Sequence, residues 1–323
     1  MPLSLLVEPW AQALLLAADE SNPWRRVGVD DTELTRIAHG VYLPSELWRA
    51  ADDDERFLWR LRAIAVAHPR HVVFSHLSAA RIWGLSTVGA WPLKPHITLS
   101  GHAHSGSTTA VTRTLVRDPF AHQTRDGLRV TSLARTVVDI ARTQALPVAL
   151  AIADQALRPA FHRPAATREE LDEEISSSSS RGRAMARTVL ELADSAAESV
   201  GESVSRASIH LAGFPAPQLQ ARFVDAEGRM FADFYWPEFE LIGEFDGKGK
   251  YLKPEYLGNF SPGEAVYREK RREDRLRALG PCVTRWDWAT ALSPRLLRAH
   301  LLRAGLPLAR GHTRTTRPSS REE

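Results

Sequence analysis

The chain has 323 residues, of which 43% are hydrophobic and 25% charged, and this balance predicts a globular protein of two or three domains. Its single cysteine, Cys282, excludes an internal disulfide and a cysteine-rich zinc site, and its apolar surroundings predict a buried strand residue. The apolar run 11–18 is too short for a signal peptide or a membrane span. We therefore expect a cytoplasmic protein with no membrane partner.

The charged residues gather in runs, although the formal charge is only +3, from 42 Lys and Arg against 39 Asp and Glu. Arginine-rich runs occupy 268–277 and 310–321. The guanidinium group presents a fork of donors that suits phosphate, so these runs favour DNA as a partner. A GC-rich genome that encodes arginine in place of lysine explains the composition equally well.

The first 50 residues contain two short runs, 9–18 and 33–38, that predict helices, the second capped by Asp31 or Thr32. His39-Gly40 then predicts a helix end, and the apolar run 41–43 a short strand. This order is typical of a helix-turn-helix with a small wing, so we predict a winged-helix-like module over 1–50.

Residues 51–160 predict a second α+β domain, which a helical linker over 161–195 follows. Its expected elements are helices over 55–67, 78–83, 133–143 and 148–157 and strands over 96–100, 109–116 and 128–130. Six histidines of this region (His68, His71, His76, His96, His102 and His104) lack the i, i+4 spacing beside an acid that a metal site needs. Ser75, His76 and Asp139 have the residue types of a hydrolase triad, but no nucleophile-elbow motif surrounds them.

Three phrases in this half carry a resemblance: RIAHGVYLP from residue 36, FSHLSAARIWGL from residue 74 and RVTSLARTVVDIAR from residue 129. They resemble the N-terminal half of AbiEi-type antitoxin and regulator proteins of type IV toxin-antitoxin systems, over about 1–150. The resemblance implies a DNA-binding winged helix. It leaves a homodimer and a partner toxin open.

The C-terminal half predicts a domain of α-β-β-β-α-β order over 196–305, before a disordered basic tail over 306–323. The expected elements are a helix over 198–212 that Gly213 ends, strands over 218–224, 230–236 and 239–246, a helix over 264–279 and a strand over 282–286. The whole chain is thus predicted to be an α/β protein.

Two acids in the central hairpin are predicted to lie on one face. A register symmetric about Pro237-Glu238 pairs Asp233 with Ile242 and Glu244 with Phe231, so the two acids become diagonal neighbours. A three-residue connection would instead send them to opposite faces. An acid inside the aromatic strand 231–236 costs free energy unless it is paired or binds a metal, and Mg²⁺ suits two converging carboxylates.

Asp233, followed by Glu244-Phe245-Asp246-Gly247-Lys248, resembles the PD-(D/E)xK nuclease superfamily, specifically the domains related to very-short-patch-repair endonucleases, over about 195–290. The resemblance implies a restriction-endonuclease-like fold and Mg²⁺- or Mn²⁺-dependent hydrolysis of a DNA phosphodiester. It assigns metal binding to Asp233, Glu244, the Phe245 carbonyl and Glu202, with Asp246 as a further catalytic acid and Gln220 facing the site.

The sequence departs from this superfamily at one position, because Asp246 stands where the catalytic lysine is usual. Lys248, Lys250 and Lys270 are candidates to supply the cation, and we favour Lys270 because a helix positions a charge better than a loop does. The same helix carries arginines predicted to contact phosphates: Arg268, Arg271, Arg272 and Arg275.

Two functions are therefore predicted. The first is a DNA-binding, metal-dependent endonuclease linked to phage defence, DNA repair or toxin-antitoxin regulation. The alternative, supported by the missing lysine, is a non-enzymatic antitoxin-type transcriptional regulator whose nuclease fold is degenerate.

Overall fold

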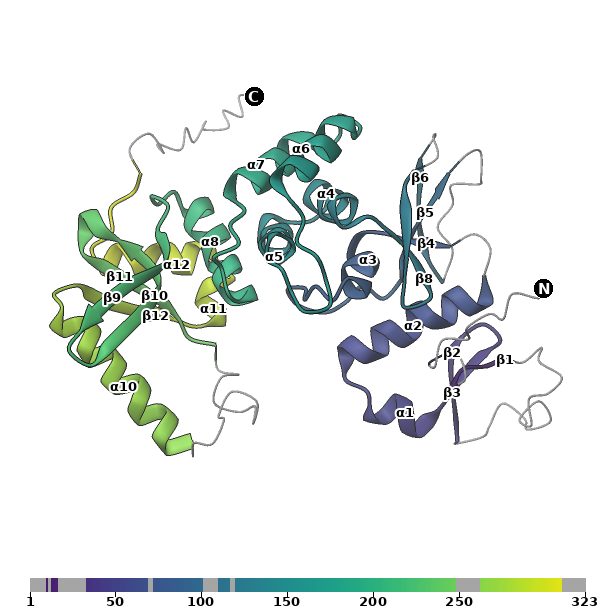
Figure 1. Ribbon diagram of the computed structural model, residues 1–323, viewed down its shortest axis with the longest axis horizontal. Coiled ribbons are helices and arrows are strands. Elements are labelled where there is room, and N and C mark those ends of the chain that lie inside the picture. Colours follow the sequence, from purple (N-terminus) through teal and green to yellow (C-terminus); the bar gives the residue numbers. More distant parts are fainter. Residues whose placement is uncertain are drawn as a thin grey trace, which may run out of the picture. The chain divides into compact units, whose positions relative to one another are not determined.

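A computed structural model describes residues 10, 13–16, 33–68, 72–100, 110–116, 120–247 and 262–309. The chain is an α/β protein that divides into two units, Met1–Ser195 and Ala196–Glu323 (Figure 1). Within the described ranges no helix combines the length and the apolar character needed to cross a membrane.

Unit 1 begins with a three-stranded antiparallel sheet of order β1-β3-β2, followed by two helices. The elements are β1 (Leu15–Leu16), β2 (Leu34–Ala38), β3 (Val41–Pro44), α1 (Ser45–Ala50) and α2 (Asp53–Ala67). The helices predicted over 9–18 and 33–38 are therefore wrong where these residues are described. Runs this short make marginal helices, whereas Gly40 at φ +71° closes a hairpin that buries Val41 and Leu43 against Ala63 of α2.

The second sheet of unit 1 has five strands in the order β6-β5-β4-β8-β7, with α3 (His76–Ile82) packed against it (Figure 1). Its strands are β4 (Val73–Phe74), β5 (His96–Ser100), β6 (Thr112–Val116), β7 (His122–Arg125) and β8 (Leu128–Thr131). The pairs β4/β8 and β5/β6 are parallel, while β4/β5 and β7/β8 are antiparallel.

Four helices complete unit 1: α4 (Leu133–Thr143), α5 (Leu146–Leu157), α6 (Arg168–Ser177) and α7 (Arg183–Leu192). The helix predicted over 133–143 is confirmed together with its cap, since the Ser132 side chain accepts a hydrogen bond from the Arg135 main-chain N–H. Because α6 and α7 pack against α4 and α5, the segment 161–195 is part of this unit and not a linker.

Unit 2 has a four-stranded sheet of order β12-β11-β10-β9 with helices around it. Its elements are α8 (Val200–Ala212), β9 (Gln218–Asp225), β10 (Gly228–Trp236), η3 (Pro237–Phe239), β11 (Leu241–Phe245), α10 (Pro262–Ala278), β12 (Cys282–Trp286), α11 (Trp288–Ala291) and α12 (Pro294–Arg303). The predicted α-β-β-β-α-β order is confirmed.

Two glycines of unit 2 lie where aromatic rings come close, one between α8 and β11 and one between β11 and β12. A Cβ atom added at Gly201 of α8 would lie 1.9 Å from the Phe245 ring, and one at Gly243 would lie 2.5 Å from the Trp286 ring. Trp286 also stacks on Phe234, with ring centroids 5.3 Å apart. Glycine at 201 and 243 therefore lets aromatic rings fill the space beside the strands.

Two sequence expectations for unit 2 are wrong. Cys282 is exposed, because it is the first residue of β12, at the edge of the sheet, and not an interior strand residue. The tail is ordered at its start: Leu306 is buried, and the Ala309 main-chain N–H donates to the Gly213 carbonyl at 2.9 Å. The rest of the tail, from 310, lies outside the described residues.

Candidate functional site

The register of the β10–β11 hairpin brings the two predicted acids closer than expected. Phe234 pairs with Gly243 and Tyr235 with Ile242, so the next step places Asp233 opposite Glu244. The predicted pairs, Asp233 with Ile242 and Glu244 with Phe231, are therefore wrong. The helical turn η3 lengthens the connection and moves the register by two residues, and an even shift keeps the side chains on the same face.

The same row continues into the flanking strands. Gln220 of β9 lies between the pairs Ala221–Ala232 and Leu219–Phe234, and therefore opposite Asp233. On the other side, Glu244 pairs with Arg285 of β12. Gln220 has φ +47°, a left-handed conformation that is uncommon for a residue with a side chain, so the backbone is strained at this row.

Asp233 ends the ladder between β10 and β11. Its Oδ2 accepts a hydrogen bond from the main-chain N–H of Phe245 at 2.8 Å. The Asp233 side chain thus accepts the hydrogen bond of the last main-chain N–H of β11, where a main-chain carbonyl of β10 would otherwise be the acceptor. This contact gives Asp233 a structural role in addition to any chemical one, and it turns the carboxylate toward the end of β11.

Glu244 is buried and paired with an arginine of α10. Only 6% of its surface is exposed, and Arg272 donates from Nη1 to Oε2 at 2.9 Å and from Nη2 to Oε1 at 3.0 Å. Burial raises the pKa of Glu244, the hydrogen bonds from Arg272 lower it, and the charge of Asp233 raises it, with a net rise. The pair of acids therefore favours a neighbouring cation.

Glu202 is also buried but serves as a capping residue of α8. Its Oε1 accepts from the Ser199 hydroxyl at 2.7 Å, and its Oε2 accepts from the Glu198 main-chain N–H at 2.9 Å. The same Oε2 accepts from Gln220 Nε2 at 3.1 Å, which links the helix to the row of polar residues. Glu202 therefore lies beside the row, with both oxygens engaged in capping.

The remaining predicted catalytic residues lie in different settings. Asp246 is half-buried, and its main-chain N–H extends the pairing with β12 by donating to the Trp286 carbonyl at 2.9 Å. Lys248 and Lys250 lie outside the described residues. Lys270 is exposed, and because two residues turn a helix by roughly 200°, it points away from the side that Arg272 presents to Glu244.

The arginines predicted to contact phosphates are held by acids at the β9–β10 turn. Arg271 pairs with Glu227 at 2.8 Å, and Arg275 donates from Nε to Asp225 at 2.7 Å. These pairs, with Arg272, fasten α10 to the sheet. The side chain of Arg268 lies outside the described residues.

The role of Arg272 as partner of Glu244 was missed by sequence reasoning, although a signal was present. Arg272 and Leu276 are four residues apart, so they share one face of the helix. Leu276 is fully buried in the cluster with Ala232 and Ile242, which fixes that face toward the sheet. An arginine on the buried face of a polar helix predicts an acid opposite it.

The acids fit a two-carboxylate magnesium site in their chemistry. Mg²⁺ is often held by one or two carboxylates together with substrate phosphates, and Asp233 and Glu244 are two carboxylates on adjacent strands. Arg272 uses one lone pair on each Glu244 oxygen, and each oxygen has a second. No cluster of three or more His, Cys, Asp or Glu side chains able to hold a metal occurs in the described part of the chain.

Ser75, His76 and Asp139 of unit 1 do not assemble as a relay. The Ser75 hydroxyl lies 3.0 Å from His76 Nδ1, but Asp139 accepts from Arg135 Nε at 3.0 Å. His76 stacks on His96 with centroids 4.1 Å apart, and burial lowers the pKa of both imidazoles to about 4. The two rings are therefore neutral near pH 7 and pack on each other, with His76 buried and His96 half-buried.

No family model matches the sequence. Two proteins of Mycobacterium tuberculosis are similar to it: the uncharacterized protein MT2308 of strain CDC 1551 / Oshkosh and the uncharacterized protein Rv2248 of strain H37Rv. Each is 28% identical over 265 residues, which cover 79% of this chain and 85% of the relative. The match is longer than unit 1, which ends at residue 195, so it extends into unit 2.

Proposed function

We propose that the protein is a DNA-binding, divalent-metal-dependent endonuclease whose catalytic centre is the acid pair Asp233 and Glu244. The observation that carries the proposal is the register of β10 and β11, which sets a buried glutamate directly opposite an aspartate. Such a pair of carboxylates at the end of two strands is costly to bury and suits a hard cation. The restriction-endonuclease-like fold that the sequence resemblance implies has acids at these places.

The residues divide the work of hydrolysis as follows. Asp233 and Glu244, with the Phe245 carbonyl, would hold Mg²⁺ or Mn²⁺ beside the scissile phosphate. The metal would supply a water molecule of lowered pKa and a positive charge next to the phosphate. Arg272 is hydrogen-bonded to Glu244, so its guanidinium would lie beside the phosphate and stabilise developing negative charge there. It thus takes the place of the superfamily lysine, while Lys270, exposed on the same helix, contacts the DNA.

A second function is favoured by the same contacts. Arg272 already neutralises Glu244, and Glu202 already caps α8, so unit 2 is satisfied without a metal. A non-enzymatic, antitoxin-type regulator would keep such a fold as a scaffold and bind DNA through the N-terminal module at 1–50. We rank it second because the resemblance to the nuclease superfamily assigns metal binding to both Asp233 and Glu244.

A nicking assay separates the two functions. Supercoiled plasmid is incubated with the full chain and Mg²⁺, Mn²⁺ or EDTA, and open-circular product is measured. We expect product with either metal, none with EDTA and none with Asp233→Asn, which keeps the size of the side chain. The matched control is Glu227→Gln, an acid of the same unit that pairs with Arg271 away from the row.

The regulator predicts a different result. Under that function the parent chain leaves the plasmid intact with both metals but still shifts it in a gel. Calorimetric titration with Mn²⁺ gives an independent readout, because only the enzyme requires a metal site that Asp233→Asn removes.

A further inference from the structure

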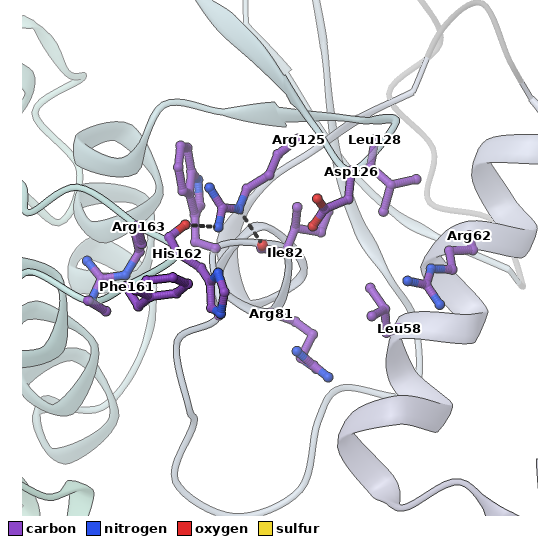
Figure 2. A pocket seen from close by; sticks show the side chains of 13 residues that line it. Leu58, Arg62, Arg81, Ile82, Arg125, Asp126, Leu128, Phe161, His162 and Arg163 are labelled. Atoms are coloured by element: carbon purple, nitrogen blue, oxygen red, sulfur yellow. Dashed lines mark hydrogen bonds between the residues drawn. The ribbon is translucent and has the colours of Figure 1, made fainter. Parts of the chain in front are cut away.

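A cavity of about 300 Å³ lies within unit 1, at the lower end of the size range of small-ligand sites (Figure 2). It forms where the β7–β8 turn meets α2, the end of α3 and the chain at 160–163. Arg62 and Arg81 approach it from α2 and α3, and Phe161 and His162 lie on its other side (Figure 2). The lining residues that matter here are Arg62, Arg81, Arg125, Asp126, Phe161 and Arg163.

Two arginines of this cavity, Arg81 and Arg125, are held by neutral groups. Arg81 donates from Nε to the Asp54 main-chain carbonyl at 2.9 Å. Arg125 donates from Nε to the Ile82 carbonyl at 3.1 Å and from Nη2 to the carbonyl of His162, and its guanidinium lies 5.1 Å from the centre of the Trp83 ring. Carbonyl oxygens and a ring fix a guanidinium without cancelling its charge, so the cavity keeps a positive potential.

Arg163 adds a further positive charge to the lining of the cavity. It is buried and donates to the carbonyls of Gln155 at 2.6 Å and Ala156 at 3.2 Å. Burial lowers the pKa of Arg163, and the charges of Arg125 and Arg158 lower it further. The cavity therefore crowds like charges, with Asp126 as the carboxylate among its lining residues, and an anion would relieve the repulsion.

An aromatic ring stands at the rim of the same cavity. Ala160 and Arg163 exchange two main-chain hydrogen bonds of 3.1 and 3.0 Å, so Phe161 and His162 form the tip of a closed turn. Phe161 is 97% exposed and meets His162 edge to face at 4.6 Å. A single exposed phenylalanine is common on protein surfaces, but here a fixed turn sets its ring beside positive charge, which is the composition of a base-stacking site.

The geometry points to a binding site for a nucleoside phosphate, with the phosphate at Arg62 and Arg81 and the base against Phe161. The terminal nitrogens of Arg81 have no partner among the described residues, and they present two donors to one phosphate. Asp126 offers an acceptor for a sugar hydroxyl or a base amino group. The ligand is a free nucleotide or the phosphorylated end of a nucleic-acid strand, which share this chemistry. This inference does not depend on the proposed nuclease.

Calorimetric titration of the full chain tests the site with five probes: inorganic phosphate, adenosine monophosphate, adenosine, and a thymidine oligonucleotide with and without a 5′-phosphate. We expect saturable binding of the monophosphate or the 5′-phosphorylated strand, and much weaker binding of adenosine and inorganic phosphate. Tight monophosphate binding identifies a free nucleotide as the source. Binding of the phosphorylated strand alone identifies a strand end.

Variants assign the binding to this cavity. Arg81→Ala should weaken the nucleotide by about tenfold or more, the loss expected for a charge-assisted hydrogen bond. Phe161→Ala should weaken the nucleotide but not inorganic phosphate, and Phe161→Trp should restore it. The control is Arg187→Ala, an exposed helical arginine of the same unit outside the cavity. Equal weakening by Arg187→Ala and Arg81→Ala, or no binding of any phosphate probe, would overturn the inference.

Discussion

Charged side chains have different kinds of partner around the acid row of unit 2 (Gln220, Asp233 and Glu244) and in the arginine cavity of unit 1. In unit 2 several charged side chains have partners of opposite sign, as in Glu244 with Arg272 and Glu227 with Arg271. In the cavity, Arg81 and Arg125 are held by carbonyls, which position a charge but leave it in place. Removal of one member of a buried pair leaves the other charge uncompensated, so a substitution should lower stability in the first region, and in the second it should lower ligand affinity.

The largest expected effect is on stability, from Arg272→Ala. The change leaves Glu244 buried without its partner, and the loss of one member of a buried pair costs about 3 kcal/mol, reduced somewhat because Arg272 is itself 26% exposed. Urea unfolding of the full chain, followed by the transition of unit 2, measures the loss. Arg277→Ala, which breaks an exposed pair with Glu273 on the same helix, should change it by less than about 1 kcal/mol.

Equal losses of unfolding free energy in Arg272→Ala and Arg277→Ala would contradict this prediction. The pair would then contribute nothing beyond a surface contact, and Glu244 would be solvated.

Asp233→Ala comes next, because it removes the acceptor for the Phe245 main-chain N–H. A buried donor left unsatisfied costs about 1–3 kcal/mol. Asp233→Asn keeps an acceptor oxygen and should lose less stability, yet it should lose Mn²⁺ affinity as fully as Asp233→Ala does. Unfolding and Mn²⁺ titration of both variants therefore separate the structural role of Asp233 from its proposed role as a ligand.

The pH dependence of stability should have opposite signs for two acids of unit 2. The raised pKa of Glu244 means that the folded chain keeps a proton above pH 4.5 that the unfolded chain has lost. Its contribution to stability is therefore full below pH 4.5 and is lost as pH rises through the folded-state pKa. The hydrogen bond from Arg275 lowers the pKa of Asp225 to about 2, so its contribution is present above pH 3.8 and lost as pH falls toward 2.

Unfolding curves between pH 2 and 8 for Glu244→Gln and Asp225→Asn check these signs. Glu244→Gln should flatten the decline on the alkaline side of pH 4.5, and Asp225→Asn the decline on the acidic side. The same slope change in both variants would contradict the assignment.

The smallest effect is expected for DNA affinity after Arg271→Ala. Arg271 is half exposed and paired with Glu227, so its contribution to a phosphate contact is partly cancelled. DNA binding by the full chain should fall steeply with salt, and this variant should reduce the slope of log affinity against log salt by less than about 1. A larger loss of slope would show that the ion pair opens on DNA.

The sequence predicted those features of unit 2 that local pattern determines. Strand periodicity placed Asp233 and Glu244 on one face, and the α-β-β-β-α-β order followed from strand and helix signals. The register was missed because η3 adds residues that a two-residue turn does not, and parity survived only because the shift is even. The strand β2 was missed because its five residues are too few to show a clear periodicity, and its conformation depends on pairing with β3.

The arginine cavity could not be predicted from the sequence. Its arginines belong to α2, α3, β7 and the turn at 160–163, and each is an ordinary surface arginine until those segments meet. Arg81, Arg125 and Arg163 are distinguished by their main-chain carbonyl partners, which depend on the folded chain.

The absence of a side chain at Gly201 fixes how closely α8 can approach β11. A single added methyl would meet the Phe245 ring at 1.9 Å, and that ring is already flanked edge-on by Trp288 at 5.0 Å. The ring therefore acts as a spacer of fixed thickness between α8 and β11. Any larger residue at 201 would lift the start of α8 from the strand, carry Glu202 away from Gln220 and widen the row from a position that touches neither acid.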